Sequence, residues 1–469
     1  MTGEADALAA IEELALDFFR WRAAVSQPIN ADDVPRCERP PDFAPDWSAG
    51  SIERMQARYS EYRRRLRDIL QASSPATWSR SNQVDAAVLA AHFERLRYEH
   101  TVLRAPWRNP DFYLAQSIGA VHDILVRGVE WLRTEAALQQ LLTRLRAVPA
   151  VLVAGQSNLE ASDEAEAEFG HIALANLEGR QNCLSQTIIA VLQVSPDASP
   201  DTAASLTAAA SAADAALQQF TEWLTNALPT MRHGHAAVGQ QGFEDFLRHV
   251  ALVDWYSIKD LETLGDLELR RSQAMSAMEE TRAQASPPRP PLPDIATQDA
   301  TIVQREGEIR AFVSEKGLLS VPDWLGHCHL RPIPPYLAPL FGLFSDNDMV
   351  VTDGLVDETR RDAGGGSGRD APIATGLTRF TPPPSDSMGF FPRSCVYDPR
   401  PQICHEGFPG RSLPAHSNCV VSICSAAKRV SSAATACHCN HIHRAPDAAG
   451  DLAAPSAASA AEVSRLCLE

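Results

Sequence analysis

The sequence contains no long uninterrupted run of apolar residues. Along its 469 residues, no segment approaches the length of about 20 apolar residues that a bilayer-spanning helix needs. The N-terminus has no basic segment, no apolar core and no small-residue cleavage site, the three parts of a secretory signal. We therefore expect a soluble protein with no membrane partner, located in the cytoplasm.

Positive charge is also scarce. The chain has 42 Lys and Arg against 59 Asp and Glu, which gives a formal net charge of −17 at pH 7. Nucleic acids and anionic membrane surfaces both repel a protein with this balance of charge. We therefore expect no nucleic-acid partner.

Aromatic residues are absent after Phe408. The segment 411–469 has 15 Ala and 9 Ser among its 59 residues, and it contains no Phe, Tyr or Trp. Without large apolar side chains, a segment cannot bury enough surface to offset the entropy that it loses on ordering. We therefore predict that residues 411–469 form a disordered or loosely helical tail.

The ten cysteines do not form the regular set of a disulfide-rich domain. Five lie in the last 59 residues, and the other five are scattered along the chain. Scattered cysteines in a protein without a secretory signal are usually free thiols. The five that we expect to be free are Cys37, Cys183, Cys328, Cys395 and Cys404.

Apolar residues at helical spacing are abundant, and hydrophobic residues make up 45% of the chain. Near the N-terminus, Ile11, Leu14 and Phe18 share one helical face, with acidic residues on the other. Proline lacks an amide proton, so we expect Pro149 to separate two helices. We expect the aromatic side chains of Trp255 and Tyr256, in a later helix, to be buried in the protein core. The expected helices cover residues 7–19, 51–72, 82–104, 111–127, 131–146, 164–194, 200–228, 241–256 and 258–284.

The composition changes after residue 285. The proline-rich segment 286–293 cannot be helical, and a single helix near 297–316 precedes a section rich in proline and glycine. We therefore predict a mainly α fold in three parts. These are a helical region 1–285, a loop-rich section 286–410 that ends in a truncated catalytic helix, and the tail 411–469.

One short motif carries chemistry. Residues 405–410 read His-Glu-Gly-Phe-Pro-Gly. In zinc hydrolases a histidine followed by a glutamate supplies a metal ligand beside a general base, which takes a proton from the metal-bound water. In the common helical motif the second histidine lies four residues after the first, and here that position is Pro409. Taken alone, such a pair is more often an ordinary surface pair.

The wider sequence resembles a bacterial family. Residues 405–410 are similar to the His-Glu-Gly-aromatic-Pro-Gly-His core of the family known as domain of unknown function 885, which resembles the gluzincin-type zinc metallopeptidases. The similarity extends over about residues 10–410. The other segments that carry it are Asn109–Tyr113, Leu145–Pro149 with Asn158 and Leu159, Val238–Phe243 with Leu247, Val321–His327 and Pro334–Pro339.

The resemblance implies a zinc-dependent hydrolase that acts on peptides. His405 would be a zinc ligand and Glu406 the general base. The next histidine of the family falls at Arg411, whose guanidinium stays protonated and offers no lone pair to a metal. The third ligand would be a glutamate in a later tryptophan-containing helix, but the last tryptophan here is Trp324. We therefore expect the chain to be inactive as written.

The loss of resemblance is abrupt and favours a reading-frame error. Residues 411–413 can still be aligned with the family's helix, and a single base change turns a histidine codon into one for Arg411. From Pro414 the similarity stops. The codons of residues 414–416, read one nucleotide later, permit Gln-Leu-Thr, and Gln-Leu is what the family's helix would have there.

Other groups could bind a metal, but a simpler interpretation is favoured for each. The Cys- and His-rich segment 437–443 lacks the spacing of a structural zinc site, and Pro414 makes His416 a poor partner for His405. The segment 233–235, His-Gly-His, is typical of a solvated loop. Cys404 has no evident base nearby that would make it a nucleophile, so we expect a packing role.

A hypothesis from a different class stays open beside the hydrolase. The chain could be a non-catalytic helical pseudoenzyme or a peptide-binding protein. Zinc content and peptidase activity distinguish the two hypotheses. The cleavage preference and the oligomeric state do not follow from the sequence.

Overall fold

The structure is a computed structural model, which describes residues 4–25, 39–125, 128–284, 290–318, 329–330, 334–340, 343, 376–377 and 396–406. The fold is mainly α, as the sequence predicts. The described residues form two compact units. The first contains the helices as far as Ala251, and the second contains Gly128 and the described residues from Leu252 onward. The three-part division at residues 285 and 410 stays a prediction.

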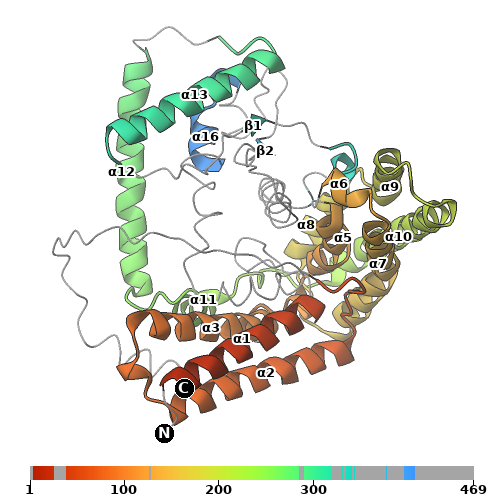
Figure 1. Ribbon diagram of the computed structural model, residues 1–469, viewed down its shortest axis with the longest axis horizontal. Coiled ribbons are helices and arrows are strands. Elements are labelled where there is room, and N and C mark those ends of the chain that lie inside the picture. Colours follow the sequence, from red (N-terminus) through yellow and green to blue (C-terminus); the bar gives the residue numbers. More distant parts are fainter. Residues whose placement is uncertain are drawn as a thin grey trace. The chain divides into compact units, whose positions relative to one another are not determined.

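The first unit consists of α-helices joined by short 3₁₀- and π-helical turns (Figure 1). Its elements are α1 (Glu4–Val25), α2 (Ala49–Ala72), η1 (Pro75–Thr77), α3 (Arg80–Tyr98), η2 (Glu99–Leu103), α4 (Ala105–Arg108), α5 (Pro110–Leu125), α6 (Val129–Leu132), α7 (Glu135–Ala161), α8 (Ala167–Leu177), α9 (Cys183–Val194), α10 (Pro200–Ala227), η3 (Leu228–Thr230), α11 (Gly239–Asp245) and η4 (Phe246–Val250).

Helices α1, α2 and α3 pack against one another through an aromatic core. Phe18 of α1 lies edge-on to Tyr62 of α2 at 5.4 Å between ring centroids and to Phe93 of α3 at 4.7 Å. All three side chains are buried, and edge-to-face pairs add to the stabilisation from burial. The apolar face that the sequence predicts for α1 is therefore the face that meets α2 and α3.

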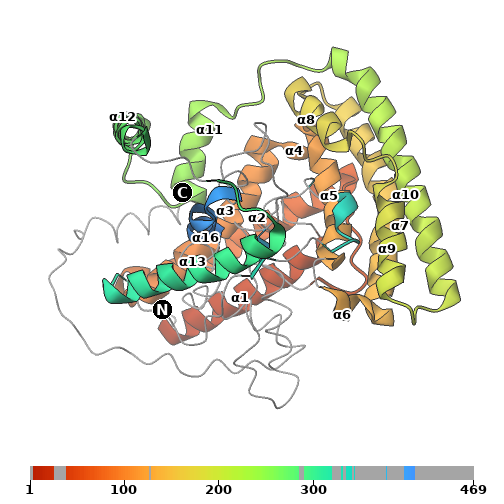
Figure 2. The ribbon, with the colours of Figure 1, turned by 90° about the horizontal axis from the view of Figure 1, so that it is seen from above.

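Helices α5, α7, α9 and α10 form the second packed group of this unit, and they lie close together in two views (Figures 1 and 2). Side chains cap the longest two. The Thr134 hydroxyl accepts a hydrogen bond from the amide of Ala137 at the start of α7, and the Ser199 hydroxyl accepts one from Thr202 at the start of α10. Such caps satisfy amide groups that have no partner within the helix.

The prediction that Pro149 separates two helices is wrong. Helix α7 runs from Glu135 to Ala161 with Pro149 inside it. The apolar residues on both sides, including Val148 and Leu152, are buried. Packing on both sides of the proline therefore outweighs the local cost of the hydrogen bond that it cannot make.

The prediction that Trp255 and Tyr256 lie on a helix and are buried in the protein core is also wrong. Their side chains are 67% and 43% exposed, and neither residue is helical. The helix expected over 241–256 ends as a π-helical turn at Val250, and Leu252 follows with a φ of 55°. A left-handed residue ends a right-handed helix, so the two aromatics lie in an exposed connection.

The second unit contains α12 (Ile258–Gln284), α13 (Ile295–Glu315), η5 (Ala338–Leu340), α16 (Arg400–Glu406) and two short strands. The strands β1 (His329–Leu330) and β2 (Gly376–Leu377) pair in parallel, with His329 opposite Gly376. Buried side chains of this unit include Ile302 of α13, Ile403 of α16 and Tyr336 before η5. The side chain of Asp294 caps α13 by accepting a hydrogen bond from Thr297.

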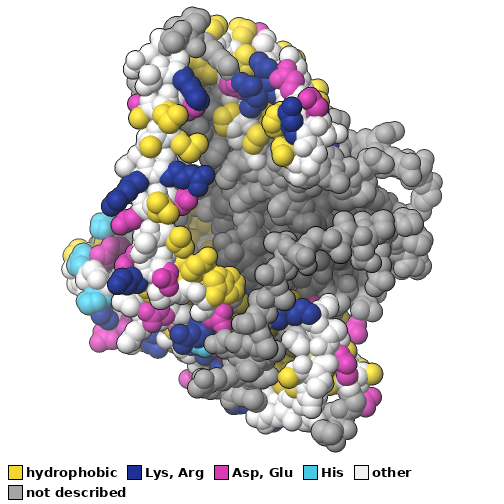
Figure 3. Space-filling model, turned by 90° about the vertical axis from the view of Figure 1, so that its left-hand side faces the viewer, with side chains coloured by type: hydrophobic (Ala, Val, Ile, Leu, Met, Phe, Trp, Pro, Cys, Tyr) yellow, Lys and Arg dark blue, Asp and Glu magenta, His cyan; other side chains and the backbone are white. Residues whose placement is uncertain are grey.

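Helix α12 differs from the others in that none of its residues is buried. The face of the molecule on which α12 lies shows hydrophobic side chains interspersed with charged ones (Figure 3). The exposed apolar side chains of α12 are Leu264, Leu267, Leu269, Met275 and Met278.

None of the described helices is long and apolar enough to cross a bilayer. The predicted tail 411–469 lies outside the described residues, and so do His416 and the segment 437–443.

Candidate functional site

The backbone of His405 and Glu406 forms the last two positions of helix α16. The helix begins with a hydrogen bond from the amide of Ile403 to the carbonyl of Pro399, at 2.9 Å. Ile403 is fully buried and packs against Ile302 and, at the edge, Ile309 of α13. Helix α13 therefore positions the short helix that carries the predicted ligand and base.

Charged side chains support the first turn of α16. Arg400 donates to Asp398 through Nε, at 2.9 Å to Oδ1 and 3.0 Å to Oδ2. These hydrogen bonds to Asp398 raise the pKa of Arg400, and the negative charge of Asp398 acts in the same direction. On α13, the carboxylate of the buried Glu306 accepts a hydrogen bond from Nε of Arg310 at 2.9 Å, so it is already engaged.

The motif by itself supplies one candidate zinc ligand, His405. A catalytic zinc is held by three protein ligands. Within the part of the chain that the structure describes, no three His, Cys, Asp or Glu residues gather closely enough to hold a metal ion. Pro409 and Arg411 lie outside that part, and the guanidinium of Arg411 has no lone pair to offer.

The prediction that Cys404 is a packing residue is wrong. Its side chain is exposed, because Ile403 takes the buried position on this turn of α16. Partial burial still raises the pKa of the Cys404 thiol above its ordinary value. A thiol with a raised pKa is a poor nucleophile at neutral pH, so the structure gives Cys404 no catalytic role.

Among the described residues, Cys183 and Cys404 are both free, as expected. Burial at the start of α9 raises the pKa of Cys183 to about 12, so that its thiol stays protonated. The predictions for Cys37, Cys328 and Cys395 fall on residues outside the described ones.

The segment 233–235 is a solvated loop, as the sequence predicts. All three residues are exposed, and Gly234 has a φ of 80°. The loop is held by its backbone, since the amide of Gly234 donates to Glu168 at 2.8 Å and that of His235 to Glu166 at 3.3 Å.

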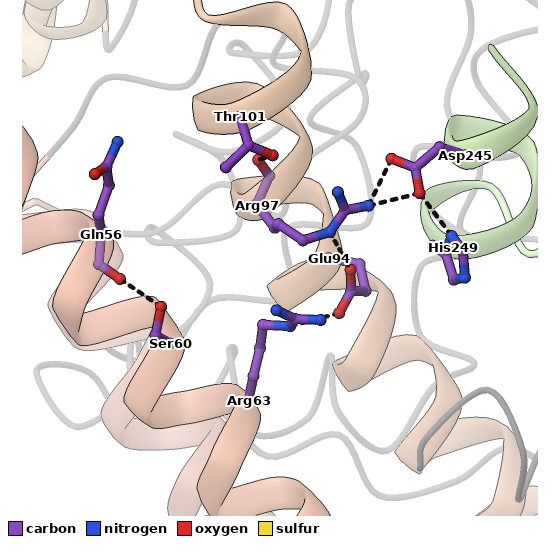
Figure 4. Close-up of polar contacts among 8 residues, drawn as sticks. All are labelled: Gln56, Ser60, Arg63, Glu94, Arg97, Thr101, Asp245 and His249. Carbon is purple, nitrogen blue, oxygen red and sulfur yellow. Dashed lines mark hydrogen bonds and ion pairs between the residues drawn. The ribbon is translucent and has the colours of Figure 1, made fainter. Parts of the chain in front are cut away.

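A network of charged residues in the first unit joins α2, α3, α11 and η4 (Figure 4). Glu94 accepts hydrogen bonds from Nε of Arg63 at 2.5 Å and from Nε of Arg97 at 2.6 Å. Arg97 also contacts both oxygens of Asp245, at 2.7 and 2.6 Å. Nδ1 of His249 lies 2.8 Å from Oδ1 of Asp245. Sequence reasoning misses this network, because Arg97 and Asp245 are 148 positions apart and no local motif links them.

The pKa values in the network follow from its pairing. Burial raises the pKa of Asp245, but hydrogen bonds and charge from Arg97 outweigh it, and the net pKa is lowered. Burial likewise lowers the pKa of Arg97, while Asp245 and Glu94 raise it to a net value above the ordinary one. Both groups therefore stay charged at neutral pH and tie α3 to α11.

Two of the segments that carry the family resemblance meet in the core of the first unit. The hydroxyl of Tyr113, near the start of α5, donates to the carbonyl of Pro106 at 2.7 Å and accepts from Nδ2 of Asn158 at 2.9 Å. Asn158 also donates to the carbonyl of Trp47 at 2.8 Å. A Cβ atom at Gly155 would lie only 2.6 Å from the Tyr113 ring. These residue types therefore serve packing rather than chemistry.

Comparison with known proteins shows the family to which the helical region belongs. A family model described as a bacterial protein of unknown function, DUF885, matches residues 38–304, from before α2 into α13. A solved structure of a protein of unknown function from Shewanella oneidensis, described as a lipoprotein, is similar to 91% of this chain and 74% of its own, with 14% identity and a TM-score of 0.50. No match was found among the curated proteins. The family match covers more than half of the 469 residues, and the chain belongs to the DUF885 family of bacterial proteins.

Proposed function

We propose that the chain is a zinc-metallopeptidase-like hydrolase that is catalytically silent as written. The observation that carries the proposal is the His405-Glu406 pair at the end of α16, a helix that is anchored to α13 by Ile403. Arg411 stands where the resemblance requires a second histidine. The chain thus retains one ligand position and the base position of a site that needs two more ligands.

The proposed roles are limited to these two residues. His405 would hold zinc, and Glu406 would take a proton from the nucleophilic water of a peptide substrate. Zinc, where a full ligand set holds it, supplies a polarised carbonyl and a water of lowered pKa. With the ligand set incomplete, we expect neither stable zinc binding nor hydrolysis.

Zinc content and peptidase activity test the proposal on the full chain. We expect less than one zinc per chain after dialysis. We also expect that any hydrolysis of a mixed peptide library is the same in the wild type and in Glu406→Gln. Glu308→Gln is the matched control, because Glu308 is an exposed carboxylate on α13. One zinc per chain that is lost in His405→Ala, with activity lost in Glu406→Gln and kept in Glu308→Gln, would overturn the claim of silence.

A peptide-binding role without catalysis is the second candidate. The match to the family covers the helical residues 38–304 and ends about a hundred positions before His405. Those helices have a packed core of their own, which supports a function that does not need the motif. Binding of a peptide library with equal strength by the wild type and by the double variant of His405→Ala and Glu406→Gln favours this candidate.

The reading-frame hypothesis explains why the site is incomplete, and DNA sequencing tests it. Resequencing codons 405–420 is expected to reveal an inserted or deleted nucleotide near codon 414. A mass spectrum of the natural protein that contains peptides from residues 414–469 would contradict it.

A further inference from the structure

Helix α12 carries a stripe of apolar side chains that is exposed to solvent. All its residues from 262 to 284 are exposed, and Leu264, Leu267, Met275 and Met278 have 41–59% of their surface exposed. At one residue per 100°, these four side chains and the partly buried Leu261 lie within about 120° of the helix circumference. We call these five residues the α12 stripe.

The stripe calls for a surface that covers it. Among the large exposed apolar side chains of α12, Leu269 alone lies outside the stripe. An isolated helix is marginally stable in water, and helices in proteins gain most of their stability by packing an apolar face. Gly265 within α12 weakens the helix further. Exposed apolar side chains gathered on one face mark an interaction surface, so the stripe indicates a partner for α12.

Four members of the stripe follow the spacing of a coiled coil. Leu261 and Leu264 are three positions apart, and Met275 and Met278 repeat this spacing two heptads later. This spacing corresponds to the a and d positions, which meet a second helix in a two-stranded coiled coil. The flexible side chain of methionine adapts to the surface that it contacts. The spacing therefore favours another helix as the partner.

The heptad between these two pairs has charged residues at its a and d positions. They are Glu268 and Arg271, whose side chains are 60% and 66% exposed, with 3.2 Å between Oε1 of Glu268 and Nη1 of Arg271. An exposed ion pair within one helix adds little to stability. Polar residues at the a and d positions do set the register and orientation of a coiled coil, so this acid and this base determine which helix fits against the stripe.

The two charges select a second copy of α12 that runs in the antiparallel direction. A two-fold axis that passes between positions 269 and 270 brings Glu268 of each copy opposite Arg271 of the other. The same axis brings the leucine pair of one copy opposite the methionine pair of the other, because both pairs lie at equal distances from it. In a parallel pair each residue would face its own copy, and Glu268 and Arg271 would each meet a like charge.

We propose that α12 is a dimerisation surface, through which two copies of this chain pair as an antiparallel coiled coil. Charged residues at the centre of the interface lower the affinity, and we expect a dissociation constant on the order of 10–100 µM. The chain is then a monomer at low micromolar concentration and a dimer well above it. This proposal does not depend on His405 or Glu406.

The first test needs no variant. Hydrogen exchange and sedimentation of the full chain are measured at about 2 µM and at about 500 µM, and the amide protons of α12 are expected to exchange at least about threefold more slowly at the higher concentration, because pairing protects them by mass action. The amide protons of the packed helix α7 should keep their rates, and the sedimentation should shift from monomer to dimer. A chain that stays monomeric, or a dimer with unchanged exchange in α12, would overturn the proposal.

The second test exchanges the charges. Glu268→Arg places a base opposite Arg271 of the other copy and is expected to weaken the dimer at least about tenfold. Addition of Arg271→Glu to the same chain brings acid and base together again and is expected to restore the dimer.

Asp266→Arg is the matched control for this test. It makes the same change of charge on the opposite side of α12, where Asp266 is exposed, and it should leave the dimer unchanged. All the altered residues are exposed, and circular dichroism checks that each variant is folded. A dimer that persists in Glu268→Arg, or a double variant that stays monomeric, would rule out the antiparallel pairing.

Discussion

Helices α7 and α12 are both 27 residues long, but they have opposite surroundings. Both are expected from apolar residues at helical spacing. Helix α7 lies among α4, α5, α6 and α10 and buries residues along its whole length, whereas α12 buries none. The comparison shows that helix formation and helix burial are separate properties, although the same sequence pattern predicts both. Local sequence decides whether a helix forms, and the partners decide how much the helix stabilises the fold.

The largest contrast is expected from matched leucines. Leu145 of α7 is fully buried, and Leu267 of α12 is 59% exposed. Leu145→Ala should lower the free energy of unfolding by about 2–5 kcal/mol, because it removes buried methyl groups and leaves a cavity. Leu267→Ala should change it by less than about 0.5 kcal/mol. Urea denaturation followed by circular dichroism measures both, and similar losses in the two variants would break the comparison.

A smaller contrast, with opposite signs, is expected from matched glycines. A Cβ atom at Gly155 of α7 would lie 2.6 Å from the Tyr113 ring, whereas one at Gly265 of α12 would meet nothing within 4 Å apart from neighbouring backbone of α12 itself. Gly155→Ala should therefore destabilise the protein by about 1–3 kcal/mol through overpacking. Gly265→Ala should raise the helix stability by up to about 1 kcal/mol, since alanine is the better helix former. Thermal unfolding of the two variants beside the wild type measures the signs, and a stabilising Gly155→Ala would contradict the packing at Tyr113.

The smallest expected effect is a change of stability with pH, and it arises from a histidine of the packed helix α3. The pKa of His92 is about 3 in the folded protein against an ordinary value of 6.5, chiefly because of burial. Below pH 6.5 the unfolded chain binds a proton that the folded chain does not, so the stability falls as the pH falls from 6.5 towards 3. At pH 5.5 this group should cost about 1 kcal/mol relative to pH 7.5.

His92→Gln is the variant that measures this contribution. Its stability should fall less than that of the wild type over the same interval, in urea titrations at several pH values. Parallel curves for the two proteins would mean that His92 titrates normally in the folded state.

The sequence predicts long helical elements with mixed success. The helix expected over 164–194 is two helices, α8 and α9, with Gly179 at a φ of 76° between them. The helix expected over 200–228 is found as α10, Pro200–Ala227, because Ser199, Pro200 and Pro229 mark its ends. Pro149 misleads, because a local signal carries no information about the core that holds both halves of α7. Trp255 and Tyr256 mislead for the same reason, since aromatic character does not show whether a partner surface exists.

The candidate sites also differ in how far the sequence predicts them. The His405-Glu406 motif can be recognised from local sequence, and its position on a helix follows from the structure. A small pocket of the first unit, lined by Arg22 of α1, Leu96 of α3 and Trp47 before α2, cannot be found from local sequence, because its wall combines segments far apart in the chain. What marks it is the missing hydrogen-bond partner of a buried cation, which only a folded chain reveals.

The exposure of α12 has a consequence for how the protein opens. A helix that buries no residue loses its hydrogen bonds by fraying, without waiting for the core to unfold. Its amide protons should therefore exchange with solvent deuterons far faster than those of α7, although the two helices have the same length. The protein then has no single unfolding temperature for its helical signal, because α12 melts gradually and the packed helices melt together.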